Sequence, residues 1–216
     1  MTASPAADPR CSPDPREWFA MPVLAGSRVR LEPLAVEHAE GYLAAAGRDA
    51  DAEEVFRWMG LPPPGTVDDA RQQVLDAVAA RAAGSRLAYA QIDAATDAFA
   101  GTTSYYDVDP GLRTIAIGHT WLGKQWWRTG FNTESKLLLM SHAFDRLDAV
   151  RVVWHTDVYN TRSQDAIARL GATREGQLRK HRIRRDGSWR DTVQYAMTDE
   201  DWPAAKERLR ARLASG

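Results

Sequence analysis

From residue 23 onward, the pattern of apolar and polar positions predicts a series of strands and helices. Residues 27–34, SRVRLEPL, alternate polar and apolar side chains, as a strand with one buried face does. Residues 36–48 have apolar positions at helical spacing. Three consecutive prolines at 62–64 end this region, because proline cannot lie inside a helix.

The next part of the chain predicts one helix and three strands. The helix is expected to begin after Thr66 or Asp68, either of which can cap it, and to end at Gly84. Strand patterns follow at 86–93, 99–109 and 113–122. The short polar links between these strands are typical of hairpins, so we expect the three strands to be antiparallel.

The remaining pattern completes a mixed α+β (α/β) arrangement. A helix is predicted at 133–147, a strand at 149–158 and a short helix at 160–171 that ends at Gly171. Two further strand-like runs flank the turn RDGS at 185–188. The centre of the chain therefore reads strand, loop, helix, strand.

The two ends differ from the middle. Residues 1–16 carry four prolines and few core-forming side chains, which predicts a disordered tail. Residues 203–216 have charges nearly all round a helix, which indicates a solvated helical appendage. The folded domain is accordingly expected at 17–202.

Composition excludes several classes of protein. With 28 basic and 29 acidic residues the formal net charge is -1, which argues against nucleic-acid binding through a general positive field. No apolar run approaches the ~20 residues of a membrane span, and the first residues have no secretory apolar core. The single cysteine, Cys11, permits no intramolecular disulfide and argues against a cysteine-based metal site. We therefore expect a cytoplasmic protein that binds no metal.

The loop GKQWWRTGFNTESK, residues 123–136, is the first candidate for chemistry. It turns at Gly130, and Asn132 is expected to cap the following helix. Unpaired N–H groups at a helix start attract phosphate, and Lys124 and Arg128 would add positive charge. The alternative is an ordinary turn in which Asn132 only caps and both cations face water.

Several motifs that follow one another along the chain favour the phosphate site over an ordinary turn. They are RLEPLAVEHAE, IAIGHTWL, TGFNTESKLLLMSHAF, VYNTRSQDAIARLGATREGQLRKHR and DGSWRDTVQYAMTDEDW. Together they resemble the GNAT (GCN5-related) N-acetyltransferase superfamily, and within it the RimJ/RimL-like branch, over roughly residues 23–202. The resemblance implies a central, mostly antiparallel twisted sheet with helices on both faces and an acetyl-CoA site at the strand-loop-helix-strand unit.

The resemblance also implies an activity. Acetyl-CoA would be the co-substrate, and its acetyl group would pass directly to a primary amine of a protein N-terminus, such as a ribosomal protein, or of a small molecule. The family's diphosphate loop, Gln/Arg-x-x-Gly-x-Gly/Ala, falls on Trp127, Gly130 and Asn132, so its first and last positions differ here. The implied cofactor-binding residues are Trp121, Leu122, Arg128, Thr129, Gly130, Phe131, Asn132, Thr133, Asn160 and Ser163.

The implied catalytic residues are Ser163, Asn160 and His119. Asn160 would bind the pantetheine arm, and Ser163 would serve the leaving sulfur, although both residues also suit the start of a helix. Relatives often carry a glutamate where this chain has Ala116, so the general base is open among His119, His155, Asp157 and a water chain. Tyr159 is an alternative acid.

The acceptor side is less defined. Trp58, Tyr105 and Tyr106 either line an acceptor groove or pack in the core. The basic run LRKHRIRR, residues 178–185, is either a charged edge strand or a docking surface for an acidic or RNA-bearing partner. A CoA-sensing module without catalysis and a structural α+β protein remain alternatives, and homodimer formation stays open.

Overall fold

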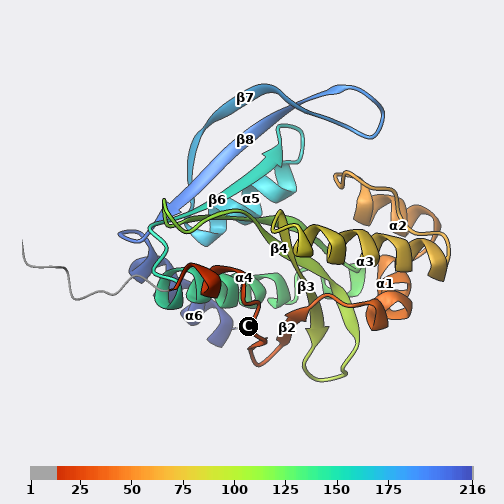
Figure 1. The fold of residues 1–216 in the computed structure, drawn as a ribbon, viewed down its shortest axis with the longest axis horizontal. Helices are drawn as coiled ribbons and strands as arrows, with labels where there is room; N and C mark the ends of the chain where they lie inside the picture. Colours follow the sequence, from red (N-terminus) through yellow and green to blue (C-terminus); the bar gives the residue numbers. More distant parts are fainter. Residues whose placement is uncertain (1–13, 216) are drawn as a thin grey trace, which may run out of the picture.

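The computed structural model describes residues 14–215, and its centre is an open sheet. Eight strands lie in the order β1-β2-β3-β4-β5-β6-β8-β7 (Figure 1). Neighbouring strands are antiparallel except β5 and β6, which are parallel. The strands are β1 Leu24–Ala25, β2 Val29–Pro33, β3 Arg86–Asp93, β4 Phe99–Asp109, β5 Thr114–Leu122, β6 Arg151–Asp157, β7 Thr173–Ile183 and β8 Trp189–Thr198.

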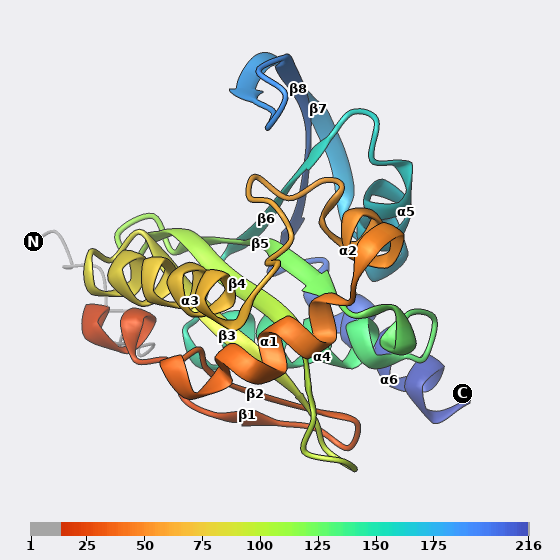
Figure 2. The same cartoon turned by 90° about the vertical axis from the view of Figure 1, so that its right-hand side faces the viewer.

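Helices cover the sheet on both faces (Figures 1 and 2). The α-helices are α1 Ala39–Ala46, α2 Asp49–Phe56, α3 Val67–Ala82, α4 Phe131–Ser141, α5 Thr161–Leu170 and α6 Trp202–Ala214. Short 3-10 helices span Pro15–Phe19, Val36–His38 and Lys124–Trp126, and a π-helical turn spans His142–Arg146. The expected α+β fold is confirmed.

The two faces are tied to the sheet by different side chains. On one face, the Trp121 ring of β5 packs edge-on against Tyr42 of α1, with ring centres 4.7 Å apart, and at a tilt against Phe56 of α2, with ring centres 4.9 Å apart. On the other face, the buried Tyr105 hydroxyl of β4 donates to the Leu139 carbonyl of α4. Tyr105 is therefore a core residue and not part of an acceptor groove.

The ends of the chain differ from the sequence expectation. Helix α6 is not solvated all round, because Trp202, Ala205 and Leu209 are buried against the core, and Trp202 stacks on Phe144 at 5.3 Å. Most of the expected disordered tail, with Cys11, lies outside the described residues. Pro15 and Arg16, however, belong to the 3-10 helix that buries Trp18.

Within residues 14–215, no helix combines the length and the apolar character needed to span a bilayer.

Candidate active site

The central strands β5 and β6 part from each other. They pair only between Thr114–Ala116 and Arg151–Val153, although β5 continues beside β4 to Leu122 and β6 beside β8 to Asp157. Beyond Ala116, the backbone groups of β5 that face β6 therefore have no strand partner. Such groups can hydrogen-bond an extended chain that enters the gap.

A bulge in β5 lies beside this gap. Ser104 of β4 pairs with Gly118 and Thr102 pairs with Trp121, so His119 and Thr120 together oppose one residue of β4. His119 adopts a left-handed backbone with φ 49°. Its ring meets the Tyr106 ring edge-on at 5.3 Å. The bulge thus turns His119 toward the face of the sheet that carries Tyr106.

The loop after β5 forms a cradle of free amides. Gly130 caps α4 with φ 78°, so the expected capping role of Asn132 is wrong: Asn132 is the second residue of the helix. The backbone N–H groups of residues 128–133 donate no hydrogen bond within the described chain. Six consecutive free N–H donors at a helix start can hydrogen-bond the oxygens of a diphosphate.

Positive charge at this cradle comes from Arg128 and from Arg162, not from Lys124. The Lys124 ammonium pairs with Asp51 at 2.7 Å and with Glu54. The Arg162 guanidinium lies 3.8 Å from the centre of the Trp127 ring. Desolvation lowers the pKa of the Arg162 guanidinium; the charge of Glu54 opposes this lowering and the charge of Arg128 adds to it, so both side chains are neighbours of Arg162.

Trp127 therefore has a structural role at the first position of the loop. Its indole N–H donates to the Leu122 carbonyl at 2.7 Å, and its face supports Arg162. Thr129 closes the same loop, with its hydroxyl donating to the Trp126 carbonyl at 2.8 Å. The Phe131 side chain is buried, so only its backbone amide faces the cradle.

Asn160 and Ser163 lie at the start of α5, next to Arg162. The Asn160 Oδ1 accepts from the Ser163 N–H at 3.1 Å, so Asn160 caps the helix. That bond leaves the Asn160 Nδ2 donor and the Ser163 hydroxyl without a partner among the described residues. Both groups are half-buried.

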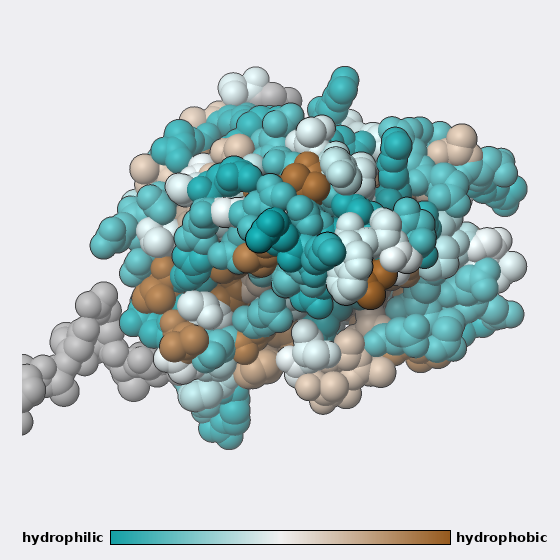
Figure 3. All heavy atoms as spheres, turned by 90° about the horizontal axis from the view of Figure 1, so that it is seen from above, coloured by the Kyte–Doolittle hydropathy of each residue, from teal (hydrophilic) through white to brown (hydrophobic). Residues whose placement is uncertain are grey.

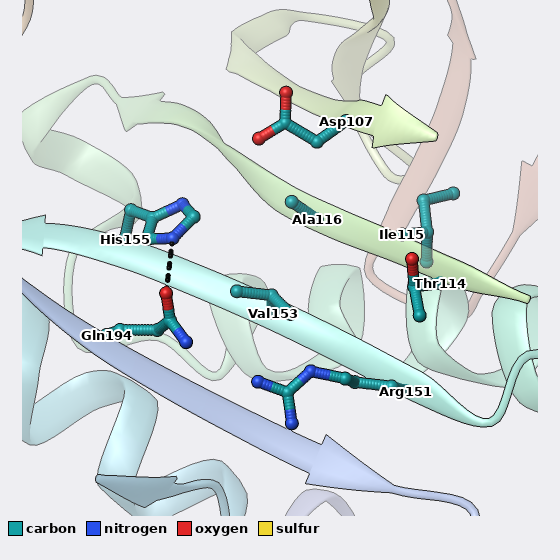
Figure 4. Close-up of a pocket in the computed structure, with 8 residues that line it drawn as sticks. All are labelled: Asp107, Thr114, Ile115, Ala116, Arg151, Val153, His155 and Gln194. Carbon is teal, nitrogen blue, oxygen red and sulfur yellow. Dashed lines mark hydrogen bonds between the residues drawn. The ribbon is translucent and has the colours of Figure 1, made fainter. Parts of the chain in front are cut away.

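A polar network crosses the open face of the sheet, and Figure 4 shows its bond between His155 and Gln194. The Tyr106 hydroxyl lies 2.9 Å from His155 Nδ1, and His155 Nε2 lies 3.0 Å from Gln194 Oε1. Gln194 in turn donates to Glu175, which Arg151 also binds. Because Gln194 Oε1 can only accept, His155 carries its proton on Nε2 and accepts from Tyr106.

This network borders a shallow hollow of about 220 Å³ between β4, β5, β6 and β8. Figure 4 shows Asp107, Ala116 and Val153 around it, with His155 at one end and Arg151 at the other. Burial raises the pKa of Tyr106 to about 12, so its hydroxyl keeps its proton at neutral pH. His155 and Tyr106 are held by each other, which leaves neither as an unengaged base.

His119 is a weak base in this setting. Desolvation, followed by the charges of Arg86, Arg182 and Arg190, lowers the pKa of its imidazole to about 4. His119 is nevertheless exposed to solvent at the bulge, with its ring against that of Tyr106. Asp157 is not free either, because Arg184 binds it at 2.7 and 3.1 Å.

Two buried side chains on α4 were not foreseen from the sequence. The Lys136 ammonium donates to Thr103 and Thr120 at 2.8 Å each, directly beneath the β5 bulge. Glu134 accepts from the N–H groups of Ser27, Arg28 and Val29 and from the Ser27 hydroxyl, at 2.6–3.0 Å. Both side chains look like ordinary polar helix positions until the helix is packed on the sheet.

The expected cofactor residues thus meet at one place. The Arg162–Trp127 contact joins the 127–133 loop to the start of α5, which carries Asn160 and Ser163. His119 lies on the bulge of β5, whose last residues Trp121 and Leu122 lead into the loop. The Trp121 side chain faces away, under α1 and α2, so only its backbone is available to a ligand.

Solved structures named as acetyltransferases share this fold. A GCN5-related N-acetyltransferase from Brucella melitensis has a TM-score of 0.83 and 32% identity, over 88% of this chain and 85% of that chain. The chain belongs to the acetyltransferase (GNAT) domain family, whose model matches residues 28–173.

Further relatives are more distant. The [Ribosomal protein uS5]-alanine N-acetyltransferase of Escherichia coli is 27% identical over 120 residues, which are 55% of this chain and 61% of that protein. The match thus spans less than two thirds of this curated relative. RimJ of Mycobacterium smegmatis, solved in complex with CoA-disulfide, shares the fold with a TM-score of 0.75 at 22% identity, over 90% of this chain and 96% of that chain.

Proposed function

We propose that the protein is an acetyl-CoA-dependent N-acetyltransferase whose acceptor is the primary amine of a polypeptide N-terminus. One observation carries the proposal: the gap between β5 and β6 opens beside six free amides at the start of α4. The relatives named for acetylation of ribosomal proteins support a peptide acceptor. A cytoplasmic location, expected from the sequence, goes with this proposal.

The residues at the gap fit a CoA thioester. The amides of residues 128–133, with Arg128 and Arg162, would hold the diphosphate. The free backbone edge of β5 and the Asn160 Nδ2 donor would hold the pantetheine arm. Acetyl-CoA, when bound, supplies an acyl group already activated as a thioester.

Transfer requires that the amine be neutral. A peptide amine has a pKa of only ~7.7–8.0, so a moderate perturbation suffices. Three arginines near His119 supply it, because nearby positive charge disfavours the ammonium form. Because position 116 is alanine and carries no acid, and because His119 is only weakly basic, the proton of the acceptor ammonium passes to water on the open face of the sheet.

The leaving thiolate needs a proton donor. The Ser163 hydroxyl, half-buried and unengaged within the described residues, would donate to the sulfur directly or through water. Tyr159 is 68% exposed, and its ring faces the Arg184 guanidinium at 5.0 Å. Ser163 is therefore the better-placed donor.

Ala116 favours one alternative, a CoA-binding module without catalysis. To distinguish the enzyme from the binding module, the protein is incubated with acetyl-CoA and a hexapeptide that starts with alanine. Released CoA and acetylated peptide are both measured. The proposal expects both products. Thermal stabilisation by acetyl-CoA without either product would favour the binding module, and no stabilisation at all would refute both.

A further inference from the structure

The β7–β8 hairpin carries several arginines beside the open face of the sheet, where the proposed acceptor would bind. Arg182 and Arg190 are direct cross-strand partners, an arrangement that is destabilising for like charges unless an anion lies between them. The Arg190 Nε is buried and has no hydrogen-bond acceptor in the described chain. Burial of an unsatisfied guanidinium donor is costly, so this N–H is suited to a ligand.

Carboxylates of the protein do not satisfy the cluster. Asp157 is 4% exposed and is bound closely by Arg184, whereas Arg190 approaches it only to 4.0 Å. Asp191, which follows Arg190 on β8, accepts instead from the Gln177 side chain and from the Lys180 N–H. Arg182 has no ion-pair partner among the described residues.

The cluster faces the site of transfer. Residues 190 and 194 lie on the same side of β8, and Gln194 bonds His155 on the open face. Arg182, Arg190 and Arg86 all lie close enough to His119 to lower the pKa of its imidazole, after the larger effect of desolvation. The Arg86 Nε donates only to the Ser104 hydroxyl, at 2.9 Å, so its charge is also unpaired.

The surface around the hairpin is mainly polar, apart from an exposed apolar pair at the hairpin end. Seen from above, the molecule is largely hydrophilic with small, separate hydrophobic patches (Figure 3). Ile183 and Trp189, paired at the hairpin end, are 63% and 56% exposed. Away from that apolar pair, charge is the main feature by which this face can select a partner.

We propose that Arg182 and Arg190 bind a carboxylate close to the acceptor amine, so that the acceptors are acidic at the positions that follow the amine. This inference rests on the proposed acetyltransferase function. One carboxylate offsets part of the positive charge of Arg182, Arg190 and Arg86 and so eases the approach of an ammonium group, while the remaining positive charge still favours the neutral amine. The carboxylate belongs either to an acidic side chain of a peptide or to the α-carboxyl of a free amino acid.

Acetylation rates of matched acceptors test the inference. Three C-terminally amidated hexapeptides start with Ala and continue with two Glu, two Gln or two Lys, and free glutamate and alanine form a second arm. We expect kcat/KM for the Glu peptide to exceed that for the Gln peptide by at least about fivefold and that for the Lys peptide by more. A preference for free amino acids over the Glu peptide would assign the carboxylate to the second source.

Variants identify the residues. Arg182→Gln removes an exposed charge from a like-charged pair and should fold normally. It should reduce the Glu-to-Gln ratio severalfold, and Arg190→Gln should do the same. Arg174→Gln, exposed on the same strand and paired with Tyr195, should leave the ratio unchanged. Equal kcat/KM for the Glu and Gln peptides in wild type would overturn the inference and leave the acetyltransferase proposal intact.

A binding measurement keeps the two proposals apart. Calorimetric titration with N-acetylated Glu and Gln hexapeptides requires no turnover. If the Glu peptide binds more tightly than the Gln peptide to wild type but not to Arg182→Gln, the carboxylate site is supported. Turnover of none of the acceptors, with this binding difference present, would refute the proposed function alone. Stronger inhibition by a short single-stranded RNA than by the acetylated Glu peptide would overturn the carboxylate site in favour of phosphate recognition.

Discussion

The buried Lys136 makes the stability of the protein depend on pH in a predictable direction. Its side chain is 5% exposed, it pairs with no carboxylate of the described chain, and burial lowers the pKa of its ammonium from 10.5 to about 7. A displacement of this size corresponds to roughly 5 kcal/mol between the charged folded and unfolded states. Between pH 7 and 10.5 the unfolded chain binds more protons, so the free energy of unfolding rises with pH.

The perturbation is Lys136→Met, which keeps the side-chain length and removes the titrating group. The Thr103 and Thr120 hydroxyls, 2.9 Å apart, can still bond each other in the variant. The Lys136 penalty is fully present below about pH 7 and falls by about 2 kcal/mol between pH 7 and 9. Other titrating groups cancel when wild type and variant are compared at each pH.

Guanidinium chloride unfolding at pH 7 and pH 9 measures the effect. Relative to the Met variant, wild type should gain about 2 kcal/mol of unfolding free energy on going from pH 7 to 9. Lys180→Met, which removes an exposed lysine, should show no such pH-dependent difference. A Lys136→Met difference that is the same at both pH values would refute the assignment of a neutralised buried ammonium.

Further predictions concern the cofactor cradle and its support. Asn160→Ala should raise KM for acetyl-CoA or lower kcat in initial-rate assays. The control Asn160→Asp keeps an oxygen that accepts from the Ser163 N–H but loses the amide donor. Full activity of Asn160→Asp would therefore mean that Asn160 serves only as the helix cap. Arg128→Ala should weaken acetyl-CoA binding in calorimetry about tenfold at low salt and less at high salt, whereas Arg169→Ala, exposed on α5, should not. Glu134→Gln should lower the unfolding free energy by about 2–4 kcal/mol in chemical denaturation, because two of the four donors that now bind the carboxylate would face an amide NH₂; an unchanged midpoint would contradict this.

Local patterns predicted the sheet well. Strands 86–93 and 99–109 match β3 and β4 residue for residue, because alternation and turn chemistry are both encoded locally. The Thr66 cap of α3 is also confirmed. Helix α6 was misjudged, because three buried side chains among many charges give a weak stripe that only packing reveals.

The site was only partly readable from the chain. The loop and the start of α5 could be aligned with family motifs, but the helix start at Phe131 followed from the left-handed Gly130 and not from Asn132. The stacking of Arg162 on Trp127 joins residues 35 positions apart, and no local pattern predicts that contact. The paired arginines of the hairpin depend on strand register, which two irregularities in β7 set.

The carboxylate of Glu134 has a consequence for motion at the cradle. Burial alone would raise its pKa, but its hydrogen bonds to the turn between β1 and β2 outweigh burial and keep it ionised. These hydrogen bonds fix the first turn of α4 to the β1–β2 edge of the sheet. The first turn of α4 is therefore held in place, and on nucleotide binding we expect hydrogen exchange to slow at the free amides of residues 128–130 while α4 itself changes little.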